Sequence, residues 1–309
     1  MRSRLAVSHA AYTGISLIFA LGMGGCGSSG SSSAPSPVRP SVTRSSAVVS
    51  HISGFVLDTG YRVLAGASVV VVDGPQAGTA TTADATGQFS LAGTFDRTTK
   101  FRATREGYVA AEQTWNCSIG ADLCSETGAR PWLGFYLASP VSPVNLAGDY
   151  TVTFTADNAC TEVPPELRTR TYLAAVTPSS EPNVPAGTSF TATARNASFL
   201  GNLNSFLIGV SGDYVDVWLH GGHDPALVEQ LGPSTYLAIS GNAAASVATS
   251  SASTVTAQFD GWIEYCVMPA PMGPIYNCGT SNTTGEPTGA AITRAHCESP
   301  NHRLTLTRR

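Results

Sequence analysis

The chain has 309 residues, enough for two domains of ordinary size. Charged residues make up 12% of it, about half of the usual ~25%, and the Gly, Ser, Thr, Ala and Val in their place favour strands and turns. The net charge of -4 becomes -6 for the chain after residue 25, because removing Arg2 and Arg4 leaves 15 bases against 21 acids. A mildly acidic chain without basic clusters argues against a nucleic-acid partner.

The first 25 residues have the pattern of a secretory signal. Arg2 and Arg4 precede an apolar stretch at 12–23, which is too short to span a bilayer. The stretch leads into Met23-Gly24-Gly25-Cys26, which resembles the lipobox of bacterial lipoproteins except at Met23, where leucine is usual. The resemblance implies that the Cys26 thiol receives a diacylglycerol and that the signal is cut just before it. An ordinary cleaved signal followed by a spare thiol is the alternative.

Residues 26–48 are predicted to be a lipidated cysteine and a flexible tether, because Gly, Ser and Pro dominate this segment. A lipid anchor followed by such a tether holds a folded domain off a membrane, and two or more acyl chains make the attachment stable. The expected location is the bacterial cell envelope, with the membrane as a partner. Gly27 follows the cysteine where an acid could stand, which favours the outer membrane in a Gram-negative host. Exposure to the periplasm and exposure at the cell surface both stay open.

Six cysteines remain after lipidation of Cys26, and an even number outside the cytoplasm predicts disulfides. None of the six has the C-x-x-C spacing of a zinc or redox site. Cys117 and Cys124 lie in one short polar loop and are expected to pair. The other four allow three pairings. The strand order favours the one that joins Cys160 to Cys297 and Cys266 to Cys278.

Residues 49–139 are predicted to form a β-sandwich. Short strands are expected at 51–57, 67–73, 78–82, 88–91, 100–105, 109–115 and 132–137. Asp84-Ala85-Thr86-Gly87 and Glu106-Gly107-Tyr108 supply turns, since Asp opens such turns through its side chain and Gly accepts a positive φ. Short strands with a turn roughly every eight to twelve residues indicate two packed sheets.

Four segments of this region resemble the carboxypeptidase regulatory-like domain: Ser53-Gly54-Phe55-Val56, Leu64-Ala65-Gly66-Ala67-Ser68-Val69, Thr82-Ala83-Asp84-Ala85-Thr86-Gly87-Gln88-Phe89 and Arg105-Glu106-Gly107-Tyr108. The resemblance covers roughly residues 50–115 and implies a transthyretin-like sandwich that serves as an accessory module. It does not imply peptidase activity, since the family is named after a domain that accompanies a catalytic one. Residues 116–130 are interpreted as a disulfide-stapled insertion on the family pattern, with a binding loop as the alternative.

Residues 144–309 are predicted to form a second all-β domain, an antiparallel β-barrel or sandwich of about eight strands. Residues 150–155 alternate strictly between large apolar and Thr side chains, which indicates a half-buried strand. Further strands are expected at 168–176, 189–196, 205–210, 214–220, 235–241, 254–265 and 303–307, with a helical turn or a loop at 226–231. If the first and last strands are antiparallel neighbours, Cys160 after the first lies beside Cys297 before the last, and a disulfide closes the barrel.

Catalytic and metal-binding patterns are scarce, and the prediction is a non-enzyme without cofactor or metal. The sequence has no H-E-x-x-H, G-x-S-x-G or phosphate-loop motif. His220-Gly221-Gly222-His223-Asp224 is the sharpest ionisable cluster, but ligands at i, i+3 are ordered best on a helix, and this stretch is interpreted as a hairpin tip. A charged run is interpreted as a surface ion-pair patch, and it consists of Glu162, Glu166, Arg168 and Arg170.

Aromatic side chains supply the candidate ligand site. On the 214–220 strand, one face carries the apolar residues expected in the core, and the other carries Tyr214, Asp216, Trp218 and His220. On the 254–265 strand, the face opposite the core carries Asp260, Trp262 and Glu264. Flat rings beside acids suit carbohydrate, because the ring stacks on C–H groups and the acids accept hydroxyl protons; the same face suits an envelope protein. Packing of Trp218 under the loop at Pro233 or against the other domain is the structural alternative.

The function expected from these observations is that of a membrane-anchored, non-catalytic binding or adhesion module of the cell envelope, with carbohydrate as the candidate ligand. A purely structural or protein-interaction component of the envelope is the alternative, and a metal-dependent enzyme is the least supported class. A carbohydrate binder should show a concave aromatic face with Trp218 and Trp262. A structural component should show flat faces without a deep pocket.

Overall fold

The structure, a computed structural model, describes residues 49–96, 98–114, 132–221, 224–225, 227–247, 253–267 and 292–309, and it describes 220, 221, 224 and 225 by their backbone alone. The predicted signal and tether lie outside these residues, and so do Cys26, Cys117, Cys124, His223 and Cys278. The described chain is all-β, as predicted, apart from one 3-10 helix, η1 (Pro165–Leu167). In this part of the protein no helix is long and apolar enough to cross a membrane.

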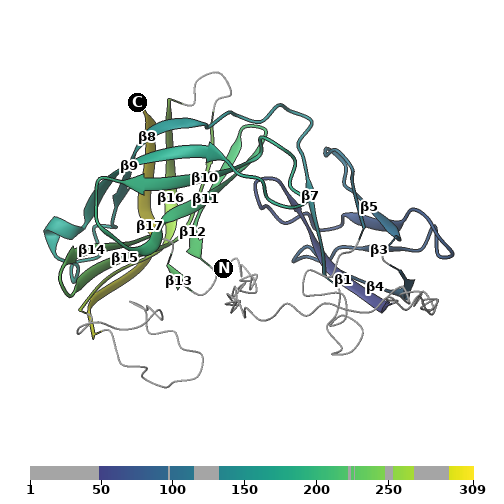
Figure 1. The fold of residues 1–309 in the computed structure, drawn as a ribbon, viewed down its shortest axis with the longest axis horizontal. Coiled ribbons are helices and arrows are strands. Elements are labelled where there is room, and N and C mark those ends of the chain that lie inside the picture. The colour runs from purple at the N-terminus through teal and green to yellow at the C-terminus, as the bar shows by residue number, and fades with distance from the viewer. Residues whose placement is uncertain are drawn as a thin grey trace, which may run out of the picture.

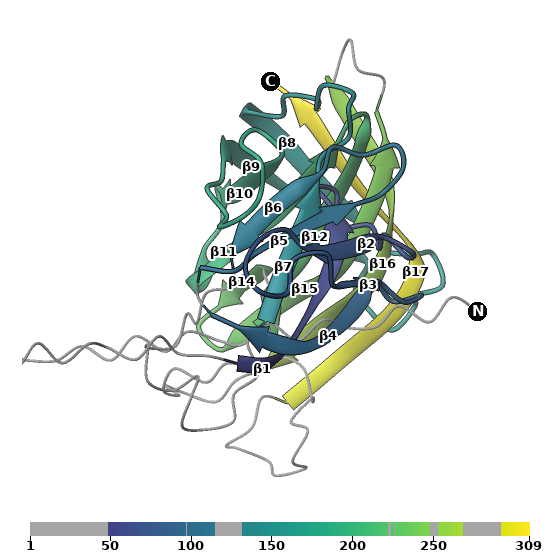
Figure 2. The same cartoon turned by 90° about the vertical axis from the view of Figure 1, so that its right-hand side faces the viewer.

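Two sheets form the N-terminal sandwich, which lies on the right in Figure 1 and in the foreground of Figure 2. One sheet has the strand order β4-β1-β7, and the other has the order β3-β2-β5-β6. All seven predicted strands are present, with small shifts of their ends. They are β1 (Val49–Asp58), β2 (Ser68–Val71), β3 (Ala80–Thr82), β4 (Gln88–Phe95), β5 (Lys100–Thr104), β6 (Ala111–Thr114) and β7 (Trp132–Leu137).

The sandwich core lies between the two sheets because alternate side chains of each strand point inward. Ile52 and Val56 of β1, Leu133 and Phe135 of β7, and Phe101 of β5 are buried there. β1 is the central strand of its sheet, antiparallel to β4 and parallel to β7. The other face of this sheet points away from the core.

Eight antiparallel strands close into a barrel, on the left in Figure 1. Their order around the barrel is β8-β9-β10-β11-β12-β15-β16-β17, and β17 pairs with β8 to complete the circle. Tyr150, Phe154, Phe190 and Phe259 are among the side chains that fill its interior. The strands are β8 (Gly148–Thr155), β9 (Thr169–Pro178), β10 (Ser189–Arg195), β11 (Phe199–Ser211), β12 (Tyr214–Gly221), β15 (Thr235–Ser246), β16 (Thr254–Val267) and β17 (Ile292–Arg308).

Two additional strands, β13 (Asp224–Pro225) and β14 (Leu227–Gly232), show that the helical turn or loop predicted at 226–231 was wrong. β15 pairs with β12 along one part of its length and with β14 along the other. β14 also pairs with β11, so it continues the wall of the barrel beyond the end of β12. The apolar run in this segment is too short for its periodicity to distinguish a strand from a turn.

The first and last barrel strands are antiparallel neighbours, which is the condition on which the predicted Cys160–Cys297 pair depended. A disulfide joins Cys160 to Cys297 beside this seam, with 5.6 Å between their Cα atoms, which confirms the predicted pair. β17 begins at Ile292 and not near residue 303, so Cys297 lies within the last strand and not before it. The strand is longer than predicted because its pairing with β16 continues to Val267. Cys266 is also disulfide-bonded, while its predicted partner Cys278 lies outside the described residues.

Part of the predicted surface ion-pair patch is instead turned into the barrel. The guanidinium of Arg170 on β9 forms a bidentate ion pair with the Glu229 carboxylate on β14. The Tyr172 hydroxyl donates a 2.8 Å hydrogen bond to the same carboxylate, and burial, with the Glu229 charge, raises the pKa of this hydroxyl. The sequence pattern missed this pair because Glu229 lies 59 residues from Arg170 along the chain.

Candidate functional site

The predicted ligand residues lie on the outer face of the barrel, on β12 and β16, with β15 between those two strands. The apolar residues that alternate with them point into the barrel core, as predicted. Trp218 lies opposite Asn242 of β15, and Asn242 in turn lies opposite Asp260 of β16. Trp262 is two residues further along β16. The two tryptophans therefore share the outer barrel face, on strands about 10 Å apart.

Burial divides the outer barrel face into an accessible and a covered part. Asp260 is exposed and Trp262 is half-buried, whereas Asp216 and Glu264 are only 6% and 1% exposed. The Glu264 carboxylate accepts a 2.5 Å hydrogen bond from the Thr293 hydroxyl. His220 is placed at the end of β12 by its backbone alone. Asp260 and Trp262 thus form the accessible end of the predicted site.

Polar groups lie beside Trp262 at this accessible end. Glu298 of β17 lies directly opposite it and is exposed. The His296 imidazole, 43% exposed, lies with its ring centroid 5.8 Å from the indole and its plane tilted by 33°. An aromatic ring beside two carboxylates and an imidazole can stack on a sugar ring and can bind its hydroxyl groups.

Trp218 instead contacts the N-terminal sandwich. Its indole stacks on the ring of Tyr61, with the centroids 5.2 Å apart and the planes 7° from parallel. Tyr214 lies beneath the Arg62 guanidinium, whose Cζ is 4.1 Å from the ring centroid. The contact is close, since a Cβ atom added at Gly209 would lie 2.5 Å from the Tyr61 ring. Trp218 therefore packs against the other domain, and the ring face that contacts Tyr61 is not open to a ligand.

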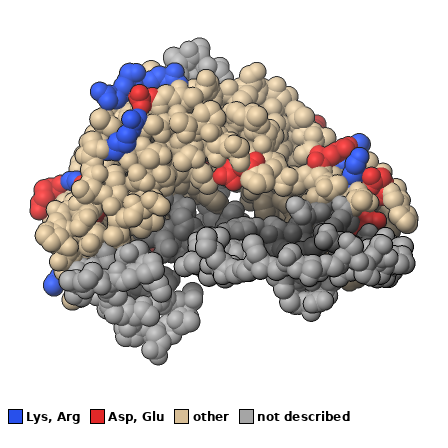
Figure 3. Space-filling model, viewed as in Figure 1, with Lys and Arg blue, Asp and Glu red and all other residues tan. Residues whose placement is uncertain are grey.

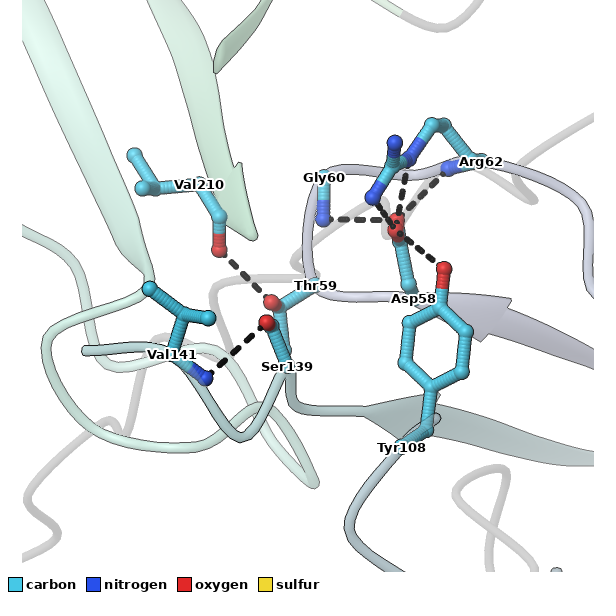
Figure 4. A network of polar contacts seen from close by, with 8 residues as sticks. All are labelled: Asp58, Thr59, Gly60, Arg62, Tyr108, Ser139, Val141 and Val210. Atoms are coloured by element: carbon cyan, nitrogen blue, oxygen red, sulfur yellow. Dashed lines mark hydrogen bonds and ion pairs between the residues drawn. The ribbon is translucent and has the colours of Figure 1, made fainter. Parts of the chain in front are cut away.

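A tightly bonded loop at the end of β1 positions Tyr61 for this contact. Figure 4 shows the hydrogen bonds that Asp58 accepts in this loop. The buried Asp58 carboxylate accepts hydrogen bonds from the backbone N–H groups of Gly60 and Arg62, both at 2.9 Å, and from Arg62 Nε at 2.7 Å. Tyr61 adopts a φ of 60°, a left-handed conformation that costs a non-glycine residue about 1 kcal/mol. The bonds to Asp58 offset this cost and hold the ring toward the barrel.

Hydrogen bonds also join the sandwich and the segment after it to the barrel. The Thr59 hydroxyl donates to the Val210 carbonyl of β11 at 2.6 Å, also visible in Figure 4. The Val144 backbone N–H, in the segment that leads from β7 to β8, donates to the Gly212 carbonyl at 3.1 Å. The junction between the domains therefore combines ring stacking with directional hydrogen bonds, which fix one orientation.

The sequence interpretation missed a row of five aromatic rings that crosses this junction. Successive ring centroids lie 6.0, 5.5, 6.0 and 5.2 Å apart. A partial signal existed in β7, where two aromatic residues alternate with core residues, but nothing local relates them to the barrel. Burial raises the pKa values of the two tyrosine hydroxyls in the row, which stay neutral at physiological pH. In order, the row consists of Trp132, Phe55, Tyr136, Tyr61 and Trp218.

Charged side chains form small, separate groups on the side shown in Figure 3. Among the described residues, no three His, Cys, Asp or Glu side chains lie close enough together to hold a metal ion. A pocket of about 110 Å³, lined by residues that include Asp149, Tyr150 and Arg195, lies on the barrel. Small-molecule sites usually have at least ~300 Å³, so the open faces offer a ligand more room than this pocket does.

Comparison with known proteins identifies the first region. Residues 51–123 match the Carboxypeptidase regulatory-like domain. This match confirms the resemblance seen in the sequence, and it extends into the segment that was interpreted as an insertion. A search of curated proteins finds no match. A solved structure from Bacteroides fragilis NCTC 9343, provisionally described as a membrane-associated protein of unknown function, is similar over 83% of this chain and 96% of its own, at 9% identity. Its TM-score of 0.22 is too low for the likeness to support a conclusion.

Proposed function

We propose that this protein is a lipid-anchored, non-catalytic carbohydrate-binding module of the cell envelope, with its site at the accessible end of the outer barrel face. The observation that carries the proposal is the half-buried Trp262 ring beside the exposed carboxylates of Asp260 and Glu298. A sugar ring would stack on the open part of the indole, and its hydroxyl groups would donate to the carboxylates. His296 would bind a further hydroxyl group.

The rigidity of the barrel supports this proposal. Trp262 stands on a strand that is paired on both sides, with β15 and with β17. The indole also packs beside a small apolar cluster on the outside of the barrel that includes Val228, Tyr236 and Ala238. A ring held in this way loses little conformational entropy on binding, so more of the stacking energy contributes to affinity.

A glycan-array screen of residues 27–309, exported with an ordinary secretory signal, tests the proposal. The wild type should bind one glycan class, and Trp262→Ala should lower the affinity by at least about tenfold through loss of stacking. Trp218→Ala is the matched control, because that ring is already stacked on Tyr61 and should matter little for binding. The site would be excluded by a wild type that binds no glycan, or by equal losses in the two variants.

A structural component of the envelope is the second candidate, and the stacking of Trp218 on Tyr61 favours it. In this stacking, Trp218 of the outer barrel face already serves as a contact between folded domains. Trp262 can contact a second protein in the same manner. Crosslinking in intact cells distinguishes the two candidates. A crosslinked protein that is lost in Trp262→Ala, together with an empty glycan array, would support the structural role.

A further inference from the structure

The outer face of the β4-β1-β7 sheet carries a second aromatic platform, at the end of the aromatic row that lies furthest from Trp218. Trp132 of β7 is 50% exposed, more than either Trp218 or Trp262. The Phe55 ring packs beside it, with 6.0 Å between the centroids and 50° between the planes. Phe55 itself lies over Gly134, where an added Cβ atom would be 2.7 Å from the ring. Gly134 thus leaves space for Phe55, and Phe55 supports the exposed indole.

Two serine hydroxyls extend this platform across the sheet. Ser53 of β1 lies directly opposite Trp132 on one side and opposite Ser90 of β4 on the other. The three residues therefore form a straight row across three strands, about 10 Å from end to end. His51 lies two residues before Ser53 on the same face, and its Nε2 is 2.9 Å from the Ser53 hydroxyl and 3.0 Å from the Ser90 hydroxyl.

The His51 imidazole leaves one of the two serine hydroxyls able to form a hydrogen bond with a ligand. Nε2 of His51 carries either one N–H or one lone pair in the plane of the ring, so it makes one strong hydrogen bond at a time. The other serine hydroxyl can then donate to, or accept from, a group outside the protein. The imidazole holds the serine that it bonds in place, which lowers the entropy that a ligand would lose on binding that serine.

The composition of this face indicates the class of ligand. None of the side chains that point outward from the three strands is an acid, a lysine or an arginine, so an anionic polymer or a charged peptide finds no counter-charge there. A neutral carbohydrate needs a flat ring for its C–H groups and uncharged partners for its hydroxyl groups, and both are present. The outward residues include Gln88, Ser90, Ala92, His51, Ser53, Phe55, Trp132, Gly134 and Tyr136.

We propose that Trp132, Ser53, Ser90 and His51 form a binding site for a neutral oligosaccharide. One sugar ring would stack on Trp132, and the next would place its hydroxyl groups against the two serines. The site goes beyond the proposed function, because it belongs to the N-terminal sandwich and involves no residue of the outer barrel face.

Calorimetric titration of residues 27–309 with maltohexaose, cellohexaose and the hexamer of N-acetylglucosamine tests this site. The titrations use the Trp262→Ala background, in which the proposed site on the outer barrel face is removed. Any binding that remains can then be assigned to the site at Trp132, whether or not the outer barrel face binds a glycan. At least one probe should bind, and adding Trp132→Ala should weaken that binding at least about tenfold. The Ser53→Ala/Ser90→Ala pair should weaken it by a smaller factor of about five, through lost hydrogen bonds.

Two controls separate loss of the site from loss of the fold. Val109→Ala trims another exposed apolar side chain of the sandwich and should bind like its parent. Trp132→Phe keeps a ring beside Phe55 and should retain part of the affinity. The proposal is overturned if none of the three probes binds, if Trp132→Ala binds as tightly as its parent, or if a charged heparin hexasaccharide binds more tightly than every neutral probe.

Discussion

His302 is a buried ionisable residue near the seam between β8 and β17. Its side chain is 1% exposed, and its Nδ1 accepts a 2.9 Å hydrogen bond from the Asp157 backbone N–H. The ring packs against Phe154 and Phe259. Burial lowers the pKa of the His302 imidazole, while the carboxylates of Asp157 and Asp260 oppose this shift by favouring the charged form. The fold therefore requires the neutral imidazole, which can accept the bond from Asp157.

We expect the free energy of unfolding to fall as the pH decreases below about 6.5, the ordinary pKa of histidine. Because the folded-state pKa is lower, the unfolded chain takes up the proton first, so acid favours unfolding until the pH has passed the folded-state value. Above about pH 6.5 the contribution of neutral His302 is fully present. Urea unfolding at a series of pH values between about 7.5 and 5 measures this dependence.

His302→Gln is the matched control for this experiment. Its amide oxygen can accept the hydrogen bond from Asp157 but does not titrate, so the variant should lose less stability than the wild type as the pH falls. Equal slopes for the wild type and the variant would show that other groups cause the pH dependence.

At the scale of elements, the seam between β8 and β17 is held by backbone pairing and by one covalent bond. The pairing extends from Thr155 to Tyr150 on β8, opposite Arg303 to Arg308 on β17. The disulfide joins residues 137 positions apart, so in the unfolded chain it closes a long loop. A long loop loses much conformational entropy when it is closed, which raises the free energy of the unfolded chain. The disulfide should therefore stabilise the barrel, but the barrel strands should pair in the same order without it.

Replacing both cysteines, Cys160→Ser with Cys297→Ser, should lower the free energy of unfolding by about 3 to 5 kcal/mol. The barrel should still form, because the strand pairing across the seam remains. Guanidinium unfolding followed by circular dichroism measures both outcomes. Cys266→Ser is the control: if its partner is the predicted Cys278, its loop is much shorter and its loss should be smaller. A double variant as stable as the wild type would contradict the expected effect of the long loop.

At the scale of the whole molecule, Tyr61 is the residue of the sandwich whose ring stacks on the barrel. Tyr61→Ala should weaken the junction by about 2 kcal/mol, through the lost apolar contact and the lost stacking on Trp218. Small-angle X-ray scattering should show a larger radius of gyration, because the two domains would no longer keep one orientation.

Two other variants probe the same junction. Tyr61→Phe keeps the ring and should leave the scattering unchanged. Gly209→Val approaches the contact from the barrel side and should expand the molecule as Tyr61→Ala does, since its side chain would displace the Tyr61 ring. Unchanged scattering in both Tyr61→Ala and Gly209→Val would show that the remaining contacts suffice to orient the domains.

Attachment to a membrane also belongs to the whole molecule. Cys26→Ala should move the protein from the membrane fraction to the soluble fraction and abolish its labelling by radioactive palmitate, because the thiol that is predicted to carry the lipid is then missing. Met23→Leu, which restores the usual lipobox residue, should be labelled at least as well as the wild type. Membrane retention and labelling in Cys26→Ala would refute the predicted anchor.

Features that depend on local periodicity and on chain order follow from the amino-acid sequence alone. Strands expose alternate residues to opposite faces, so strict alternation is enough to assign Val215, Val217 and Leu219 to the core. Local turn chemistry separates the seven strands of the sandwich. The order of the barrel strands predicts the Cys160–Cys297 pair once the first and last strands are taken to be antiparallel neighbours, although Cys297 lies within the last strand and not before it.

What covers the outer faces of the sheets depends instead on tertiary packing. Alternation shows that Trp218 points away from its own core, but the ring stacked on it comes from Tyr61, 157 residues earlier in the chain. Arg170 likewise has charged neighbours in sequence, yet it pairs with Glu229. Ser90, Ser53 and Trp132 come from three separate strands, and only strand register brings them into one row. Contacts between distant segments depend on how whole sheets pack, and a local pattern carries no information on that.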